Sequence, residues 1–265
     1  MPELPEVETI VRYNRPEIHG RRILGLWTDT ARLFRGTTFT KIKKEILGAR
    51  ILDVSRRGKN ILFHLSGGRD LIFHLMMTGK LLLFPRAPKE RHVHFWMKLG
   101  TKDFLALHDI RKFGWARLVP ERHILGIGKD ALSVSPEELK EIFEKRKGSI
   151  KSLLLNQSAI SGIGNIYSDE ILWYAGIGPA RRAGELKERE LRKLYLATKA
   201  VLNKAIKAGG TSSRDYRKPD GSKGGYYEIR KAYQRTGEKC SRDGTVIRRI
   251  KIGQRSAHFC PKHQN

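Results

Sequence analysis

The chain opens with the stretch Met-Pro-Glu-Leu-Pro-Glu-Val-Glu-Thr-Ile-Val-Arg, residues 1–12. From Pro5 onward the pattern is helical, because proline fits the first position of a helix and apolar side chains then recur on one face. We expect the helix to end at Pro16, since proline lacks the N–H that a helix interior requires. The sequence therefore predicts a helix that begins at Pro5 and ends at Pro16.

Pro2 is a candidate nucleophile. Removal of Met1, which a compact following proline favours, makes Pro2 a terminal secondary amine that condenses with an aldehyde to a charged iminium. An unperturbed pKa near ~8 leaves much of such an amine unprotonated at neutral pH. Glu3 is the adjacent acid that can shuttle protons to and from the sugar, and Glu6 can orient the terminus or the sugar. Taken alone, these residues also fit an ordinary N-terminal helix.

Charge narrows the class of partner. The 265 residues include 53 Lys and Arg against 27 Asp and Glu, a formal charge of +26. Such a surface concentrates phosphate polymers, so nucleic acid is the leading partner class. An anionic membrane is the competing partner, and we expect none because no apolar run reaches spanning length. No secretory signal opens the chain, so we expect an intracellular protein of the cytoplasm or nucleoid that is not secreted.

Two kinds of pattern divide the chain. Short β-runs separated by glycine turns predict a β-sandwich or barrel in the first half. Helical patterns follow a glycine-rich boundary near residue 126. The expected strands are 23–27, 51–55, 60–65, 70–75, 80–84, 93–98, 104–108 and 115–119. The expected helices are 136–145, 150–155, 166–174 and 188–208.

Residues 2–9 closely resemble the opening of the formamidopyrimidine-DNA glycosylase family, bifunctional enzymes that excise oxidised purines. Further matching motifs run almost to the last residue. The resemblance implies an α+β multidomain fold in three parts. These are an N-terminal β-sandwich catalytic domain with an N-terminal helix (1–125), a helix–two-turn–helix DNA-binding domain (126–230) and a C-terminal β-hairpin zinc-finger-like segment (231–265).

The stretch Arg-Arg-Gly-Lys-Asn, residues 56–60, lies between two expected strands. By itself it fits a solvated basic hairpin. It matches the Gly-Lys element of the family, whose lysine approaches the phosphates of the damaged nucleotide and assists proton transfer during elimination. The resemblance therefore implies a catalytic or phosphate-clamping role for Lys59.

Two loops, residues 74–79 and 109–114, resemble family loops that contact DNA. An enzyme that acts on a base takes it out of the stack, so an apolar wedge must fill the gap and a guanidinium can satisfy the orphaned partner base. Taken alone, Met and Phe beside glycine are more often core residues. The resemblance assigns DNA contacts to His74, Met77, Arg111 and Phe113.

His92 and His94 alternate along an expected strand and therefore share a face. They resemble a metal-binding pair, but no third ligand is apparent nearby in the sequence. The family resemblance instead implies that His92 contacts DNA.

Residues 161–172 place two glycines, Gly162 and Gly164, directly before a helix, and glycines at this density let backbone amides approach a phosphate. No strand of a dinucleotide site precedes it. The stretch matches the helix–two-turn–helix signature of the family, which implies DNA-backbone contacts at Asn165 and at Lys151 on the preceding helix. Asn156 stands where relatives often carry Asp.

Residues 209–227 form a long polar, glycine-rich stretch. Loops of this length are usually functional or disordered. The stretch resembles the capping loop that folds over an everted oxidised purine in the family. It favours 8-oxoguanine or formamidopyrimidine lesions over oxidised pyrimidines.

The last segment contains both cysteines. The family finger holds zinc with two Cys-x-x-Cys pairs, and the same spacing here yields Cys240, Asp243, Cys260 and His263. This set can bind Zn²⁺ as a structural ion, although aspartate is unusual in a closed site and binding should be weaker. His258 is another possible ligand, and a metal-free finger or free thiols are the alternatives. Arg255 matches the minor-groove arginine of the family and is assigned a part in the second elimination.

These features predict a bifunctional DNA glycosylase and abasic-site lyase. We expect a monomer whose partner is double-stranded DNA containing oxidised bases or abasic sites. No redox or nucleotide cofactor is implied, because the iminium supplies its own electron sink. A non-catalytic, lesion-recognising DNA-binding protein on the same scaffold is the alternative, and an RNA-binding protein is a weaker one.

Overall fold

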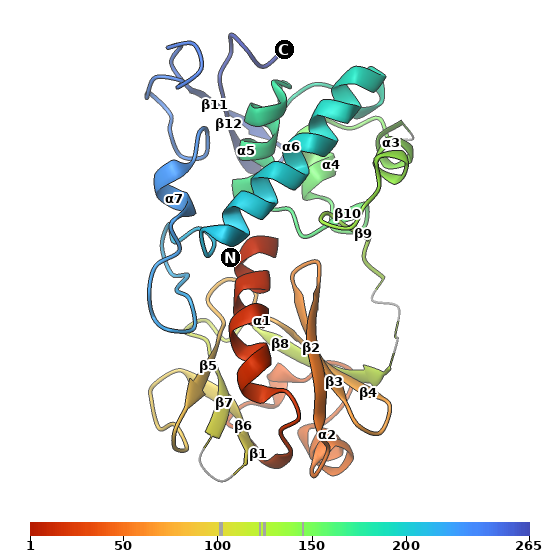
Figure 1. Ribbon diagram of the computed structural model, residues 1–265, viewed down its shortest axis with the longest axis vertical. Helices are drawn as coiled ribbons and strands as arrows, with labels where there is room; N and C mark the ends of the chain where they lie inside the picture. The colour runs from red at the N-terminus through yellow and green to blue at the C-terminus, as the bar shows by residue number, and fades with distance from the viewer. Residues whose placement is uncertain (101–102, 122, 124–125, 145) are drawn as a thin grey trace. The chain divides into compact units, whose positions relative to one another are not determined.

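The computed structural model describes every residue except 101–102, 122, 124–125 and 145. The domain boundary expected at residue 125 and the helix end expected at residue 145 lie outside the described residues. The chain forms two compact units (Figure 1), and each is described by itself. The first unit holds residues 1–125 and 209–224, and the second holds residues 126–208 and 225–265.

The first unit contains two antiparallel sheets of four strands, ordered β1-β6-β7-β5 and β2-β3-β4-β8. Every strand expected in this half is present, with ends shifted by at most two residues. The strands are β1 (Ile23–Thr28), β2 (Ile51–Arg57), β3 (Asn60–Leu65), β4 (Arg69–His74), β5 (Lys80–Phe84), β6 (Val93–Leu99), β7 (Asp103–His108) and β8 (Trp115–Pro120).

The two sheets pack face to face through aromatic side chains. The ring centroid of Phe73, on β4, lies 5.5 Å from that of Phe63 in its own sheet and 5.5 Å from that of Phe95 in the other. All three side chains are almost fully buried. Alternate residues of each strand therefore face a shared apolar core, which is the arrangement of a β-sandwich. The expected sandwich is confirmed.

The N-terminal helix α1 (Leu4–Ile18) is longer than expected. It continues through Pro16, so the predicted end at that residue is wrong. The last turn is retained because the N–H of His19 still donates to the carbonyl of Arg15 at 3.0 Å. Ile18 is buried in the core of the sandwich, and this burial offsets the cost of proline inside a helix.

The sequence did not predict helix α2 (Phe39–Ile46). The hydroxyl of Thr38 accepts a hydrogen bond from the N–H of Lys41 at 3.2 Å and caps its start. Ile42 and Ile46, one turn apart, are both buried in the sandwich core. A cap and two apolar residues are therefore sufficient to form a short helix within a lysine-rich stretch.

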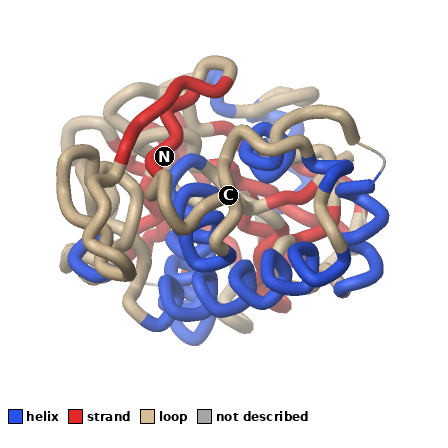
Figure 2. The backbone as a smooth tube through the Cα atoms, turned by 90° about the horizontal axis from the view of Figure 1, so that it is seen from above, coloured by secondary structure: helices blue, strands red, loops and turns tan. Residues whose placement is uncertain are grey.

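The second unit is mainly helical; its helices are blue and its strands red in Figure 2. The expected helices are present, and α7 was not expected. The helices are α3 (Pro136–Glu144), α4 (Ile150–Leu155), α5 (Asn165–Ala175), α6 (Glu188–Lys207) and α7 (Tyr226–Ile229), with η1 (Ala31–Leu33) in the first unit and η2 (Ala183–Glu185) here as short 3-10 turns. The strands are β9 (Lys129–Asp130), β10 (Ile160–Ser161), β11 (Arg248–Ile252) and β12 (Arg255–Phe259).

Strands β11 and β12 form the antiparallel hairpin expected near the C-terminus. A buried carboxylate on α5 fixes the segment that leads into it. Both oxygens of Glu170 accept backbone N–H groups, from Lys231 at 2.8 Å, Ala232 at 2.8 Å and Tyr233 at 2.9 Å. Burial raises the pKa of Glu170. Within the described residues, no helix has the length and apolarity needed to cross a bilayer.

Candidate functional site

The start of α1 brings two carboxylates beside Pro2. The N–H of Glu3 donates to Oε2 of Glu6 at 2.8 Å, which closes a reciprocal cap at the first turn. Pro2, Glu3 and Glu6 are all buried. The cap therefore fixes the backbone of the predicted acid, Glu3, which directly follows the predicted nucleophile. In the chain as numbered, Met1 acylates Pro2, so the ring nitrogen is an amide.

Polar contacts tie the turn that precedes Lys59 to α1. Nε of Arg56 donates to Glu8 on α1 at 2.9 Å, and its Nη1 donates to the carbonyl of Gly58 at 2.9 Å. Burial raises the pKa of Glu8, but hydrogen bonds and charge from Arg12 and Arg56 outweigh it, so the pKa is lowered overall. Glu8 is therefore a carboxylate that fixes the turn preceding Lys59. Lys59 itself is 6% exposed.

His74 lies at the end of β4, where its backbone pairs with that of Asn60, the neighbour of Lys59. Burial first, and then the positive charges of Lys59 and Arg35, together lower the pKa of His74 to about 4. Its Nδ1 accepts the N–H of Met76 at 3.0 Å, so the ring is neutral and carries its proton on Nε2. Nε2–H is the atom available to donate to a phosphate oxygen.

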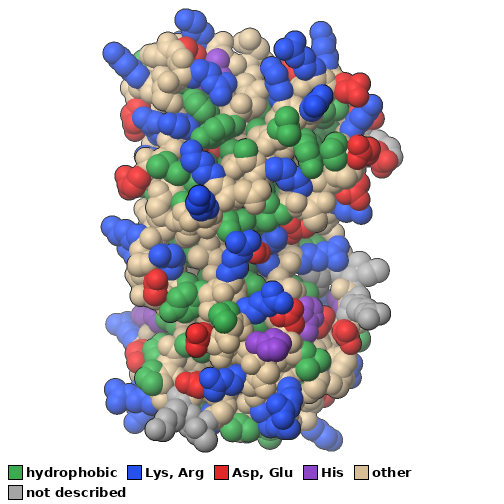
Figure 3. Space-filling view, viewed as in Figure 1, with side chains coloured by type: hydrophobic (Ala, Val, Ile, Leu, Met, Phe, Trp, Pro, Cys, Tyr) green, Lys and Arg blue, Asp and Glu red, His purple; other side chains and the backbone are tan. Residues whose placement is uncertain are grey.

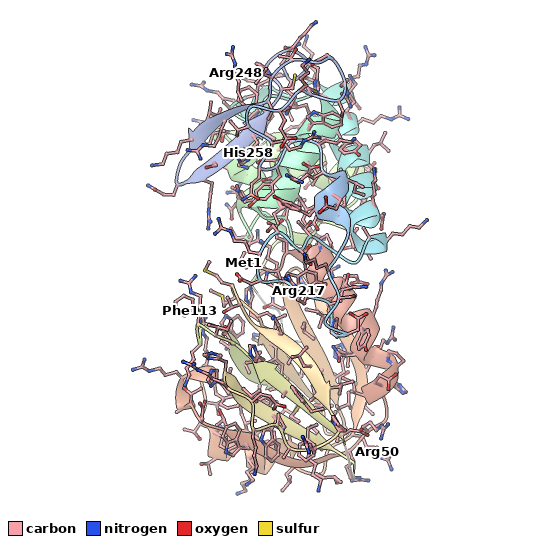
Figure 4. The ribbon with its side chains drawn as sticks, turned by 90° about the vertical axis from the view of Figure 1, so that its left-hand side faces the viewer. Met1, Arg50, Phe113, Arg217, Arg248 and His258 are labelled. Carbon is pink, nitrogen blue, oxygen red and sulfur yellow. The ribbon has the colours of Figure 1, made fainter. Side chains whose placement is uncertain are left out.

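The predicted wedge residues are brought together at one place in the first unit. Nη1 of Arg111 approaches the sulfur of Met77 at 3.1 Å, and its guanidinium lies 4.6 Å from the ring centroid of Phe113. Met77 is 41% exposed and Phe113 is 47% exposed, unlike the core residues that such side chains usually are. Figure 4 shows Phe113 at the same end of the unit as Met1, with Arg50 at the opposite end.

Asp109 builds this cluster, although the sequence did not single it out. Its carboxylate accepts the hydroxyl of Thr78, the N–H of Arg111 at 3.2 Å and the N–H of Gly114 at 2.7 Å. It is 1% exposed. One buried acid therefore joins the two loops that carry Met77, Arg111 and Phe113. Its place as the first residue of the family-like loop 109–114 was the available signal.

His92 lies just before β6, with a positive φ of 71°. Its ring is close to two others, 6.4 Å from that of His94 and 5.8 Å from that of His108. Nδ1 of His94 is 2.8 Å from a carboxylate oxygen of Asp29. The structure thus supplies a third imidazole, that of His108, but within the described residues these rings are not gathered into a metal-binding group.

In the second unit, Asn165 is the first residue of α5, where the helix N-terminus presents its partial positive charge. Gln157 holds the preceding turns. Its Nε2 donates to the carbonyls of Leu155 at 3.0 Å and Ile163 at 2.7 Å, and its Oε1 accepts the N–H of Gly162 at 3.0 Å. These contacts fix the glycine turns before the helix.

Asn156 has a structural role in the same region. It follows the last residue of α4, and its side-chain oxygen accepts the N–H of Ser158 at 3.0 Å and the hydroxyl of that residue at 2.7 Å. This local turn starts the connection to β10. An aspartate oxygen would accept the same bonds, which accounts for either residue at this position.

Lys151 does not face solvent. Its side chain is 0% exposed, and its ammonium forms an ion pair with Asp169 and donates to the hydroxyl of Ser168 at 3.2 Å. The other oxygen of Asp169 is 2.7 Å from Nδ1 of His258. In this structure Lys151 therefore connects α4 to α5, and we now assign it an internal structural role in place of the predicted phosphate contact.

The hairpin carries Arg255 at the start of β12, exposed and paired with Ile252 across the turn. The four predicted ligands come together from the two sides of the hairpin, Cys240 and Asp243 from before it and Cys260 and His263 from after it. Their ligand atoms all lie within 4.8 Å of one another. His258, the other ligand considered, is instead bound to Asp169.

The surroundings of these four side chains fit a metal ion. Nε2 of His263 is 3.2 Å from the carbonyl of Trp173, which fixes the ring proton there and leaves Nδ1 facing the cluster. That Nδ1 is 3.6 Å from the sulfur of Cys240 and 3.2 Å from Oδ2 of Asp243. The indole N–H of Trp173 also approaches the sulfur of Cys240 at 3.4 Å. Outer hydrogen bonds of this kind orient the ligands of metal sites, so the four side chains are arranged as they would be to hold a metal ion.

Three family models match the chain. The formamidopyrimidine-DNA glycosylase N-terminal domain matches residues 1–116 and the helix–two-turn–helix domain of the same family matches residues 125–217. The zinc finger found in this family and in isoleucyl-tRNA synthetases matches residues 237–262. The three matched segments follow the sandwich, the helical region and the hairpin in order.

Individual relatives match along the whole length. The formamidopyrimidine-DNA glycosylase of Solibacter usitatus is 41% identical, covering 100% of this chain and 99% of the relative. That of Carboxydothermus hydrogenoformans is 38% identical, with 100% of both chains covered.

Solved structures of the same family are similar to this chain over its whole length. A Lactococcus lactis variant in complex with DNA containing Fapy-dG has a TM-score of 0.92 at 38% identity and 100% coverage of both chains. The Lactococcus lactis protein in complex with DNA containing an abasic site has a TM-score of 0.91 at 38% identity and 99% coverage of both. This chain belongs to the formamidopyrimidine-DNA glycosylase family.

Proposed function

We propose that this chain is a bifunctional DNA glycosylase and abasic-site lyase that excises 8-oxoguanine and formamidopyrimidines from duplex DNA. The observation that carries the proposal is the start of α1, where Pro2, the capping residue Glu3 and Glu6 in the first turn are all buried, in a chain similar to such enzymes over its whole length. The high positive charge supports a duplex as the partner, and Lys and Arg side chains are spread over the face shown in Figure 3.

The proposed chemistry begins with an unblocked Pro2. Its ring nitrogen attacks C1′ of the damaged nucleotide, the C1′–base bond breaks, and Glu3 supplies the proton that helps the base depart. The nitrogen, now bonded to C1′, gives up its proton through Glu3 to O4′ as the C1′–O4′ bond breaks, so the sugar ring opens to an iminium, which acidifies the C2′ proton. Loss of that proton expels the 3′ phosphate, and a second elimination expels the 5′ phosphate. Water finally releases the sugar remnant and regenerates the amine.

Other candidate residues assist these steps. We assign Lys59 to the phosphates of the damaged nucleotide and to proton transfer, supported by the Glu8 and Arg56 contacts that fix the turn before it. We assign Arg255 to the minor groove and to the second elimination, and Glu6 to orienting the terminus. Neutral His74 donates to a phosphate through Nε2, and His92 and Asn165 contact the backbone.

The wedge cluster supports eversion of the damaged base. Met77 and Phe113 are exposed apolar side chains beside the guanidinium of Arg111. We propose that the apolar groups keep the neighbouring bases apart and that Arg111 satisfies the orphaned partner base. Residues 209–224 then cover the everted purine.

We propose that the metal of the finger is Zn²⁺, held by Cys240, Asp243, Cys260 and His263. Thiolate, imidazole and carboxylate are all accepted zinc ligands, and four protein ligands close the site to water. Bound zinc supplies structural stability to the hairpin and takes no part in the chemistry. We also propose that a domain boundary lies between residues 230 and 231 and separates this finger from the helical region.

The function is tested by incubating the chain with a duplex that contains one 8-oxoguanine. The proposal expects release of the free base together with strand cleavage on both sides of the lost nucleotide. Binding to the lesion duplex without either product would instead support the alternative, a non-catalytic DNA-binding protein. Mass spectrometry of the purified protein shows whether Met1 has been removed, which the proposed chemistry requires.

A further inference from the structure

We propose that the first residues of segment 209–224 position the nucleophile, in addition to covering the base, and that they act through Glu6. This inference rests on the proposed function. It assigns Gly210 and the backbone of Thr211 as positioning residues for chemistry at the sugar, a step in which no base needs to be recognised.

Glu6 joins two parts of the chain that are far apart in sequence. Its Oε2 accepts the N–H of Glu3 at 2.8 Å, and its Oε1 accepts the N–H of Thr211 at 2.7 Å. The side chain is 2% exposed, and Glu6, Glu3 and Thr211 all belong to the first compact unit. One oxygen of the carboxylate therefore accepts from the backbone next to Pro2, and the other accepts from the first residues of the segment.

Gly210 makes this close approach possible. It has a φ of +83°, and a Cβ at this position would lie 2.8 Å from Oε1 of Glu6, 2.9 Å from its Cγ and 3.1 Å from Cε1 of Tyr216. Real Cβ atoms do not approach so closely, so any larger residue must displace Glu6 or the segment. Glycine is needed here because of the contact with Glu6 as well as the backbone conformation.

The last residue of the segment, Gly224, packs against its first residues. A Cβ on Gly224 would lie 2.4 Å from the carbonyl oxygens of both Gly209 and Gly210, and the N–H of Gly224 donates to the hydroxyl of Ser212 at 2.8 Å. The two ends of the segment are thus packed against each other directly beside Glu6. A displacement of these packed segment ends would move the carboxylate of Glu6, which accepts the N–H of Glu3. The backbone that carries Pro2 would move with it.

An abasic duplex separates this role from base recognition, because it offers no base for the segment to cover. We would measure the single-turnover rate of borohydride trapping on an abasic duplex at saturating protein, for the chain with Met1 removed. Gly210→Ala should lower this rate about tenfold, since small displacements of reacting groups are costly. Its affinity for the same duplex should stay unchanged.

Gly48→Ala is the matched control. Gly48 lies in the same unit with the same φ of +83°, but nothing lies within 4 Å of the added Cβ. It therefore introduces the same backbone strain without a contact to Glu6, and it should trap at the wild-type rate. Thermal unfolding of both variants checks that they are folded.

A double-mutant cycle tests whether Gly210 acts through Glu6. Glu6→Gln keeps the shape of the side chain but leaves one acceptor oxygen for the N–H groups of Glu3 and Thr211. It therefore also tests the connection through Glu6 if Gly210→Ala does not fold. The proposal expects the two variants together to trap no more slowly than the worse one alone. Wild-type trapping by Gly210→Ala, equal loss in Gly48→Ala, or fully additive effects would overturn it. If the chain without substitutions, with Met1 removed, forms no adduct, the proposed function itself is overturned.

Discussion

Asp109 shows how one buried acid can set the geometry of an exposed cluster. It accepts from Thr78, Arg111 and Gly114, and it is 1% exposed while Met77 and Phe113 are solvent-accessible. The residues proposed to enter the DNA stack therefore depend on a residue that would never touch DNA.

Asp109→Asn should loosen this cluster. An amide has one acceptor oxygen and adds an NH₂ donor that would face N–H groups, so at least one buried donor loses its partner. We expect the free energy of unfolding to fall by about 1–3 kcal/mol and the affinity for a lesion duplex to fall as well. Urea denaturation and a binding titration measure the two effects. A variant with unchanged affinity would show that the cluster does not depend on this carboxylate.

Lys151 is the residue whose environment the sequence could not predict. Nothing in the local pattern distinguishes a buried lysine from an exposed one, because its partner Asp169 follows 18 residues later and the second partner of that acid, His258, follows after a further 89. Only the folded chain brings these three groups together.

Lys151→Met should be strongly destabilising, by about 3–5 kcal/mol, because it leaves the buried Asp169 without its main cation. If Lys151 instead contacted phosphate, the variant would keep its stability and its DNA binding would become less dependent on salt. Denaturant unfolding and a salt titration distinguish the two roles. Lys140→Met, in an exposed pair on α3, is the control and should cost little.

His74 should make stability depend on pH. Its folded pKa is about 4, below the ordinary value of 6.5, so the unfolded chain binds this proton more readily. Its contribution to stability is therefore complete above pH 6.5 and is lost as the pH falls from 6.5 toward 4. His74→Gln should show a shallower fall in unfolding free energy over this interval. Identical pH profiles for the two proteins would contradict the assigned neutral ring.

At the scale of elements, the strands and the longer helices follow directly from periodicity and glycine turns. The sequence failed where packing decides the outcome. Core burial of Ile18 carries α1 past Pro16, and burial of Ile42 and Ile46 forms α2 in a stretch that reads as polar. The family resemblance implied the hairpin finger and its four ligands, but the role of Trp173 in orienting His263 depends on tertiary contact.

The finger should bind metal more tightly when its thiolates are restored. Asp243→Cys replaces a carboxylate with a softer ligand, so zinc should be removed by a competing chelator only at higher chelator concentration than for the natural chain. Asp220→Cys is a control outside the cluster and should leave zinc retention unchanged. The assignment of Asp243 as a ligand would be wrong if the two variants released zinc alike.

At the scale of the whole molecule, a formal charge of +26 predicts that affinity for undamaged duplex falls steeply with salt. Arg255→Ala should reduce the slope of log affinity against log salt by about 1, as expected for the loss of one phosphate contact. Binding titrations at several salt concentrations measure this slope. An unchanged slope would remove Arg255 from the proposed DNA interface.

The central claim is that the nitrogen of Pro2 bonds to the sugar of the damaged nucleotide. The direct measurement is borohydride reduction of the protein with an 8-oxoguanine duplex, followed by proteolysis and mass spectrometry of the cross-linked peptide. The claim predicts a sugar remnant attached to the peptide that begins at Pro2, and no adduct with Pro2→Gly above a small residual level. An adduct on a lysine such as Lys59, or no adduct at all, would contradict it.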